Sequence, residues 1–392
     1  MLATAPLAAQ VAIRGETVYT MAGAPIRNGV VLIGRDGKIE QVGPANSVRV
    51  PNGYRTLSGR VVTPGLIDAH SVVGLSGFLN QPHDQDQLDT SGPIQPELRA
   101  VDAYNPRERL VEYVRQFGVT TLHTGHGPGA LASGQTIVVK TRGTDVATAV
   151  IDTFGMVAMT LGPDVQSNFK SPGTSAKSVA MLRQELIKAQ EYARKLVAAK
   201  PDAPVARDLK LDALAAVLRG EVPALITAHR ATDILDALRL QREFGFKLVL
   251  DGASEAYLLI PQIREAGIPV ILHPTMMRTG GDTRNAAVTT AKLLMDAGIT
   301  VALQSGYEGY VPKTRIVLFE AGMAAGYGLP MEQALATITT NAAKILGLQD
   351  RVGSLQRGMD GDVAVFDGDP FEFTTHVCAV TIQGEVVSDS CH

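Results

Sequence analysis

The feature that most constrains the fold is a long middle region, residues 61–351, in which short apolar segments alternate with amphipathic ones. The short segments are rich in Val, Ile and Leu, which is typical of buried strands, and the longer ones repeat apolar residues at helical spacing. We expect strands at residues 61–69, 119–123, 136–139, 156–161, 224–228, 247–250, 269–272 and 300–303. We expect helices within residues 176–200, 231–244, 255–266, 288–297, 315–325 and 331–346.

Eight strands that alternate with helices predict a parallel α/β architecture. The length of this region suits a closed (β/α)8 barrel, which takes about 250 residues. An open doubly wound sheet is the alternative. The glycine-rich segments do not favour it, because no GxGxxG or Walker pattern stands between a strand and a helix.

Both ends of the chain have a different, β-rich pattern. Residues 11–42 alternate apolar and polar side chains around a turn at Asp36-Gly37, and residues 362–367 and 377–387 again predict strands. We therefore expect a small composite β-sandwich domain formed by both termini, in two parts. The predicted boundaries are 1–60 for its first part, 61–351 for the barrel and 352–392 for its second part.

The charge balance argues against some partners. With 36 basic and 39 acidic residues the formal net charge is −3, and no basic stripe is present, so we expect no nucleic-acid binding. The sequence contains no run of about 18 apolar residues, so we expect no membrane span. The expected partner is a small-molecule substrate, with a homodimer as the expected assembly.

Two sequence features concern the cellular compartment. The only cysteines are Cys378 and Cys391, too few for a disulfide framework or a Cys-rich zinc site. Residues 2–10, LATAPLAAQ, are similar to the end of a signal peptide's apolar region. This favours a periplasmic or secreted protein, with a cytoplasmic one as the alternative.

Histidines gather where the predicted strands end. Five of the eight, His70, His123, His126, His229 and His273, lie at or just after strand ends. Active sites of (β/α)8 barrels are built at the carboxyl ends of the strands. The distribution therefore favours a functional site at the barrel mouth, although a single histidine there is more often structural.

Two motifs identify a family resemblance. The segment VVTPGLIDAHSVVG, residues 61–74, resembles the first barrel strand of the amidohydrolase superfamily. The segment at residues 341–370, NAAKILGLQDRVGSLQRGMDGDVAVFDGDP, resembles that superfamily's return into its composite β-domain. The closest branch holds imidazolonepropionase-like and dipeptidase-like hydrolases. The resemblance implies a distorted barrel with one or two divalent metal ions, usually zinc, that hydrolyses C–N bonds.

The metal-binding pattern that this resemblance implies is only partly present. His70 and His229 stand where the family has histidine ligands on strands one and five. Val72 replaces the second histidine of strand one, and a valine has no donor atom for a metal. Pro163 lies near the position of the bridging carboxylate or carbamylated lysine, one residue before Asp164.

Metal-binding residues of the family pattern are also missing at strands six and eight. Asp251 or Gly252 occupies the position of the strand-six histidine, and Gly306 lies where strand eight has its aspartate. That aspartate serves the family both as a ligand and as the general base. We therefore expect a degenerate metal site, with at most one zinc ion or none.

Neighbouring residues suggest how a site could be rebuilt. The candidate metal ligands are His70, His229 and His123; the candidate catalytic residues are Asp251, Glu308 and His126; the candidate substrate-binding residues are Arg278, Arg284 and His273. The alternative is a structural role, in which the histidines form hydrogen bonds with each other, with the backbone or with water. Lys140 and Lys170 are interpreted as structural or surface residues.

A polar loop follows the first strand. Its Asp-x-Asp spacing at Asp84 and Asp86, between His83 and Asp89, is faintly similar to a calcium loop. The glycine turn and closing glutamate of an EF-hand are missing, so calcium is not expected. A long loop over a barrel mouth usually serves as a lid or a subunit contact.

Two hypotheses of different classes follow. The first is a hydrolase acting on a C–N bond of a small amide, lactam or dipeptide-like substrate through a single-metal or rearranged site. The alternative is a catalytically inactive binding or scaffold protein that keeps the fold without metal. A metal-free hydrolase, using Asp251 or Glu308 with a histidine base, is a third option.

Overall fold

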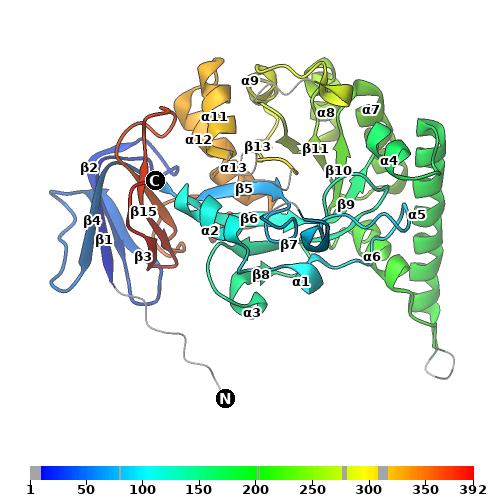
Figure 1. The fold of residues 1–392 in the computed structure, drawn as a ribbon, viewed down its shortest axis with the longest axis horizontal. Coiled ribbons are helices and arrows are strands. Elements are labelled where there is room, and N and C mark those ends of the chain that lie inside the picture. The colour runs from blue at the N-terminus through cyan, green and yellow to red at the C-terminus, as the bar shows by residue number, and fades with distance from the viewer. Residues whose placement is uncertain (1–9, 79–80, 201, 203, 276–279, 308–316) are drawn as a thin grey trace.

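The structure is a computed structural model and describes residues 10–78, 81–200, 202, 204–275, 280–307 and 317–392. It contains two bodies that lie side by side (Figure 1). One is a sheet built from both ends of the chain, and the other is a barrel of strands and helices. This arrangement confirms the predicted fold class.

The terminal sheet has seven strands in the order β16-β15-β14-β4-β1-β2-β3. Their bounds are β1 Val11–Val18, β2 Ile26–Ile33, β3 Ile39–Pro44, β4 Arg55–Pro64, β14 Val363–Phe366, β15 Val377–Ile382 and β16 Glu385–Ser388. The two cysteines form a disulfide that ties Cys391 to β15 through Cys378.

The barrel sheet has the order β13-β12-β11-β10-β9-β7-β6-β5, with β8 paired to β7 outside this path. Its strands are β5 Leu66–Ser71, β6 Val119–Gly125, β7 Gly134–Lys140, β8 Val150–Asp152, β9 Val157–Thr160, β10 Ala224–Ala228, β11 Leu248–Gly252, β12 Val270–Leu272 and β13 Val301–Leu303. A parallel bridge between Ser71 and Gly306 joins the two ends of the sheet. The barrel is therefore nearly closed.

One strand departs from the expected parallel arrangement. β7 runs antiparallel to both of its neighbours, β6 and β9. The connection between β6 and β7, residues 126–133, contains no helix. A chain that returns without a crossover helix must reverse direction, so the expectation of an all-parallel barrel is wrong at β7.

The segment expected as one strand at residues 61–69 is divided between the two sheets. β4 passes the boundary expected at residue 60 and ends at Pro64, and β5 begins at Leu66. Gly65 separates them. A Cβ atom there would overlap the side chain of Thr120, so only glycine allows this close approach.

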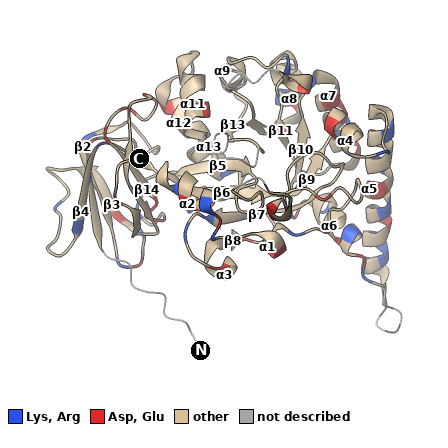
Figure 2. Cartoon of the chain, viewed as in Figure 1, with Lys and Arg blue, Asp and Glu red and all other residues tan. Residues whose placement is uncertain are grey.

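Helices cover the outside of the barrel, and charged side chains gather on them rather than on the strands (Figures 1 and 2). The α-helices are α1 Ala100–Ala103, α2 Arg109–Gln116, α3 Val146–Ala149, α4 Pro163–Asn168, α5 Ser175–Ala198, α6 Leu209–Leu218, α7 Ala231–Phe244, α8 Ile260–Ala266, α9 Thr290–Asp296, α11 Val317–Gly326, α12 Met331–Thr337 and α13 Thr340–Ile345. Single turns of 3-10 helix are η1 Pro82–Asp84, η2 Ala256–Leu258 and η3 Gly281–Thr283. None of the described helices combines the length and apolar character that a membrane crossing requires.

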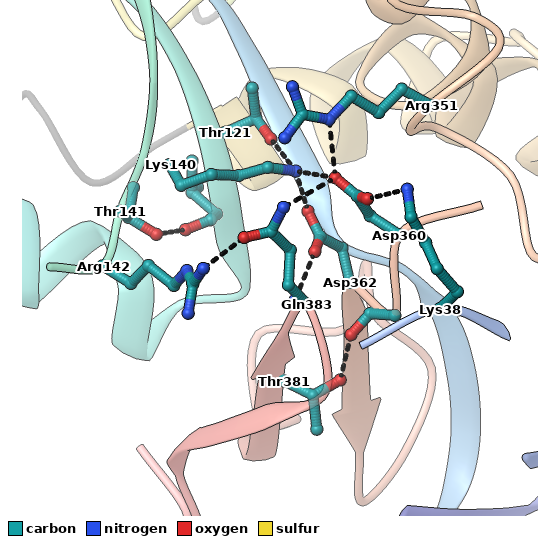
Figure 3. Close-up of polar contacts among 12 residues, drawn as sticks. Lys38, Thr121, Lys140, Thr141, Arg142, Arg351, Asp360, Asp362, Thr381 and Gln383 are labelled. Carbon is teal, nitrogen blue, oxygen red and sulfur yellow. Dashed lines mark hydrogen bonds and ion pairs between the residues drawn. The ribbon is translucent and has the colours of Figure 1, made fainter. Parts of the chain in front are cut away.

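A buried ionic cluster joins the two bodies (Figure 3). Lys140, at the end of β7, pairs with Asp362 and lies 3.2 Å from Oδ2 of Asp360, both on the segment that leads into β14. Lys38 and Arg351 pair with Asp360 at 2.6 and 2.9 Å. Lys140 is fully buried here, so of the two alternatives foreseen for it the structural one applies, whereas Lys170 is exposed.

Candidate functional site at the barrel mouth

The strands present an apolar layer inside the barrel and a polar layer beyond it. Leu225, Val249, Ile271 and Ala302 pack together in the interior. Because side chains of a strand alternate between its faces, the residue two positions later points the same way. Those residues are Thr227, Asp251, His273 and Gln304, and all four are buried. The mouth is therefore lined by polar groups from four strands.

Asp251 lies at the centre of this polar layer. Its Oδ1 accepts hydrogen bonds from Nδ1 of His70 at 3.2 Å and Nε2 of Gln304 at 2.7 Å. Its Oδ2 accepts from Oγ1 of Thr227 at 2.6 Å and from the hydroxyl of Tyr307. Each carboxylate oxygen thus has two donors, which uses the acceptor capacity of the group.

These contacts keep Asp251 ionised despite its burial. Burial raises the pKa of the Asp251 carboxyl, and His70, Thr227 and Tyr307 lower it by more. The net result is a pKa below the ordinary value. Burial, followed by the Asp251 charge, raises the pKa of Tyr307 well above its usual range, so the phenol stays a neutral donor.

His70 is oriented by this carboxylate. An ionised Asp251 accepts only, so Nδ1 of His70 carries the hydrogen and Nε2 keeps a lone pair. The Nε2 atom is buried and has no hydrogen-bond partner within the described part of the chain. The rings of Tyr307 and His123 pack beside His70, with centroids 4.9 and 5.5 Å away. A carboxylate-oriented imidazole with a free Nε2 is the arrangement of a general base.

His229, just after β10, presents a second imidazole. The hydroxyl of Ser254 donates to the carbonyl of His273 at 3.3 Å, so its oxygen accepts from Nδ1 of His229 at 2.7 Å. This assignment leaves the lone pair on Nε2. Burial, with a smaller effect from His273, lowers the pKa of His229 to about 4. His229 is therefore neutral at physiological pH.

His123 has a structural role. Its Nδ1 donates to the carbonyl of Ala69 at 2.7 Å, and its Nε2 accepts from Oγ1 of Thr136 at 2.6 Å. Burial, followed by the nearby His70, lowers the pKa of His123 to about 3. Because both ring nitrogens are used within the fold, neither one is free for a metal ion. The geometry thus contradicts the prediction of His123 as a metal ligand and fits the alternative of a structural histidine.

Within the described part of the chain, His126 and Arg284 are not among the hydrogen-bond partners of Asp251. His126 is buried against Gly134, and the charges that act on it come from Asp86 and Asp89. Arg284 is exposed in the turn after η3. Glu308 and Arg278 lie outside the described residues.

His273 is at the mouth as predicted. Its ring centroid is 6.1 Å from that of Tyr307, and its Nδ1 lies 3.9 Å from Oε1 of Glu320 on α11. The predicted residues that the structure brings together are thus His70, Asp251, His229 and His273.

Sequence reasoning missed several members of this cluster. Thr227, Gln304 and Tyr307 all contact Asp251, and Asp68 accepts hydrogen bonds from Ser305 across the closure of the barrel. Burial raises the pKa of Asp68 to about 7. Counting two residues onward from the apolar interior layer would have found Thr227 and Gln304.

The donors present do not fit the metal centre that the family resemblance implies. Catalytic zinc takes three protein ligands and structural zinc takes four. This mouth offers imidazole nitrogens on His70, His229 and His273, while Asp251 already accepts four hydrogen bonds. Val72 is a buried apolar side chain. Among the described residues no group of three His, Cys, Asp or Glu side chains is placed to hold a metal ion.

Comparison with known proteins assigns the family. A model of the amidohydrolase family matches residues 227–388. The crystal structure of an amidohydrolase from Thermotoga maritima MSB8 is 30% identical, with a TM-score of 0.90 over 97% of this chain and 100% of that one. This chain belongs to the amidohydrolase family. The family membership that the PGLIDAH and carboxyl-terminal motifs predicted is confirmed.

Curated relatives of this amidohydrolase include imidazolonepropionases and a further amidohydrolase. An imidazolonepropionase from Stenotrophomonas maltophilia is 27% identical, covering 88% of this chain and 87% of that protein. Amidohydrolase tasK from Hapsidospora irregularis is 25% identical over 90% of this chain. The chain spans only 39% of the length of tasK.

Proposed function

We propose that this amidohydrolase hydrolyses a C–N bond of a small amide, lactam or dipeptide-like substrate with an imidazole base in place of the family's metal centre. The observation that carries the proposal is the His70–Asp251 pair, in which Nδ1 donates to an ionised carboxylate and Nε2 has no partner. Family membership and the imidazolonepropionase relatives support a lactam or related amide as substrate.

The proposed step uses water as the second substrate. His70 Nε2 takes a proton from water while the water oxygen bonds to the carbonyl carbon. The C–N bond then breaks, and His70 returns the proton to the leaving nitrogen, so atoms and charge balance. Asp251 holds the imidazole in the correct tautomer and stabilises the imidazolium between the two transfers.

His229 is assigned a positioning role. It has a lone pair at Nε2 but lacks a carboxylate partner at Nδ1, which faces Ser254 instead. With a pKa of about 4 it holds a proton poorly at neutral pH, so it is a weaker base than a paired imidazole. We assign it to accept a hydrogen bond from an N–H group of the substrate.

A binding protein without catalysis is the second candidate, favoured by one observation. The donors around Asp251 form hydrogen bonds within the fold, and the Nε2 atom of His70 is buried. A hydrogen-bonded polar network rigidifies a site and needs no chemistry to explain it.

One experiment separates these candidates. Turnover of imidazolones, lactams and dipeptides is measured with excess chelator present, for the wild type and for His70→Ala, Asp251→Asn and His376→Ala. The last variant is a matched control, because His376 forms a similar pair with Asp367 at 2.9 Å on the terminal sheet.

We expect chelator-resistant turnover that falls about 10²–10⁴-fold in His70→Ala and also falls in Asp251→Asn, as loss of a general base and its partner does. His376→Ala should match the wild type. Turnover that the chelator abolishes would contradict the metal-free base. Saturable binding without turnover of any substrate would favour the binding protein.

A further inference from the structure

A second cavity lies at the end of the barrel opposite the mouth. Its volume is about 610 Å³, and it is lined by Lys247, Pro269 and Thr300, the residues that directly precede β11, β12 and β13. Asp251 and His273 stand at the other ends of β11 and β12. The cavity is therefore separate from the site around Asp251, and its volume is within the range of ligand sites, about 300–1,000 Å³.

Much of the lining of this cavity is apolar. Pro223, Pro269 and Ile345 line it as half-buried side chains, and the buried Ile268 and Ile299 complete this part of the wall. Such a wall offers van der Waals contact without hydrogen bonds. It suits the hydrocarbon part of a ligand.

Three basic side chains line the same cavity. Lys247 precedes β11, Arg264 is in the last turn of α8, and Lys344 is in the last turn of α13. No Asp or Glu of the described residues lines the cavity. Within the same described residues, the three basic side chains form no ion pair and no hydrogen bond. The cavity thus has positive charge and no counter-charge in its lining.

Capping of helix ends does not account for these charges. Basic side chains can donate to the last carbonyl groups of a helix. Here backbone N–H groups do so instead: Gly245 donates to Gln241 at the end of α7 at 2.8 Å, and Gly267 donates to Arg264 at the end of α8 at 3.1 Å. The basic groups of the cavity therefore remain available to a ligand.

The acidic residues that flank the lining in the sequence do not neutralise it. Glu265 is exposed beside Arg264 and is not part of the lining. Three others form ion pairs elsewhere, namely Glu221 with Arg219, Glu243 with Arg183 and Asp296 with Lys292. Charge complementarity therefore favours an anion as the occupant of the cavity.

We propose that this cavity binds a small amphipathic anion, a carboxylate on a short hydrocarbon chain. Lys247, Arg264 and Lys344 attract the carboxylate, and the chain lies against the apolar part of the lining. A carboxylate only accepts hydrogen bonds, and the ammonium and guanidinium groups only donate them, so the two sides match. The proposal does not depend on the proposed hydrolysis at the barrel mouth.

Calorimetric titration of the full chain with sodium hexanoate at low ionic strength tests this proposal. Hexanol is the neutral analogue, hexylammonium chloride the analogue of opposite charge, and inorganic phosphate the anion without a hydrocarbon chain. The variants are Arg264→Gln alone and the combination of Lys247→Gln, Arg264→Gln and Lys344→Gln. Arg242→Gln is the matched control, because Arg242 is exposed in the last turn of α7 but does not line the cavity.

We expect hexanoate to bind the wild type and Arg242→Gln equally, and more tightly than the three comparison compounds bind. Arg264→Gln should weaken binding by up to about fivefold, the effect of one exposed ion pair, and the triple variant by at least about tenfold. Absence of binding, unchanged binding in the triple variant, or equal weakening in Arg242→Gln would overturn the proposal. Hexanol, hexylammonium or phosphate binding as tightly as hexanoate would also overturn it.

Discussion

Asp251 shows how one residue can decide what a barrel mouth is able to do. A buried carboxylate is costly unless hydrogen bonds compensate it, and four donors do so here. The same four bonds leave no acceptor capacity for a metal ion. The carboxylate instead fixes the His70 tautomer, which is why the candidate base depends on two residues rather than one.

Glu108 gives a pH prediction at the same scale. Burial raises the pKa of Glu108 from 4.5 to about 7 in the folded chain. Between these values the unfolded chain releases the proton and the folded chain retains it, so stability falls as pH rises through this window and levels off above it. Glu108→Gln has no proton to release and should not show this loss.

The measurement is the free energy of unfolding of both proteins in denaturant from pH 4.5 to 8. The free energy of unfolding of Glu108→Gln, relative to that of the wild type, should rise by on the order of 2–3 kcal/mol across the window, because one pKa unit corresponds to about 1.36 kcal/mol. The difference between the proteins is the relevant quantity, because buried His229 and His123 titrate in both. A constant difference would show that Glu108 is not desolvated.

At the scale of elements, the sequence predicted the strands well because their interiors are apolar runs of fixed period. The eight expected strands all correspond to strands of the structure, and the histidines that follow them lie near the mouth where expected. The direction of β7 was missed, because hydrophobic pattern reports burial and not the sense of the chain.

The chemistry of the site was only partly predictable for a related reason. His70 and Asp251 are 181 positions apart, and Gln304 and Tyr307 come from a further strand end. The hydrophobic pattern of the strands predicts that each residue lies at the mouth. The hydrogen-bond partner of each nitrogen depends on three-dimensional packing, which the pattern does not report. His123 illustrates this, since only the contacts to Ala69 and Thr136 distinguish a structural imidazole from a ligand.

The whole molecule depends on how the terminal sheet is attached to the barrel. Lys140 is the buried charge from the barrel that meets Asp360 and Asp362 of the terminal segment (Figure 3). Removing one partner of a buried ion pair leaves the other charges uncompensated and costs about 3–5 kcal/mol. The exported location and the homodimer remain predictions at this scale.

Lys140→Ala should therefore lower the free energy of unfolding by roughly 3 kcal/mol in chemical denaturation, with little dependence on salt. Lys38→Ala is the control, because Lys38 contacts the same Asp360 but is 40% exposed. The decrease in the free energy of unfolding should be smaller in Lys38→Ala than in Lys140→Ala, and added salt should reduce it. Equal effects of the two variants would show that the cluster is open to solvent.

The central proposal is that a His70–Asp251 pair serves this amidohydrolase in place of the metal centre of its family. Titration of metal-free protein with zinc, followed by calorimetry, tests it most directly, with His229→Ala as the comparison. The account predicts no stoichiometric zinc binding and the same trace for both proteins. One equivalent bound tightly by the wild type and lost in His229→Ala would contradict it.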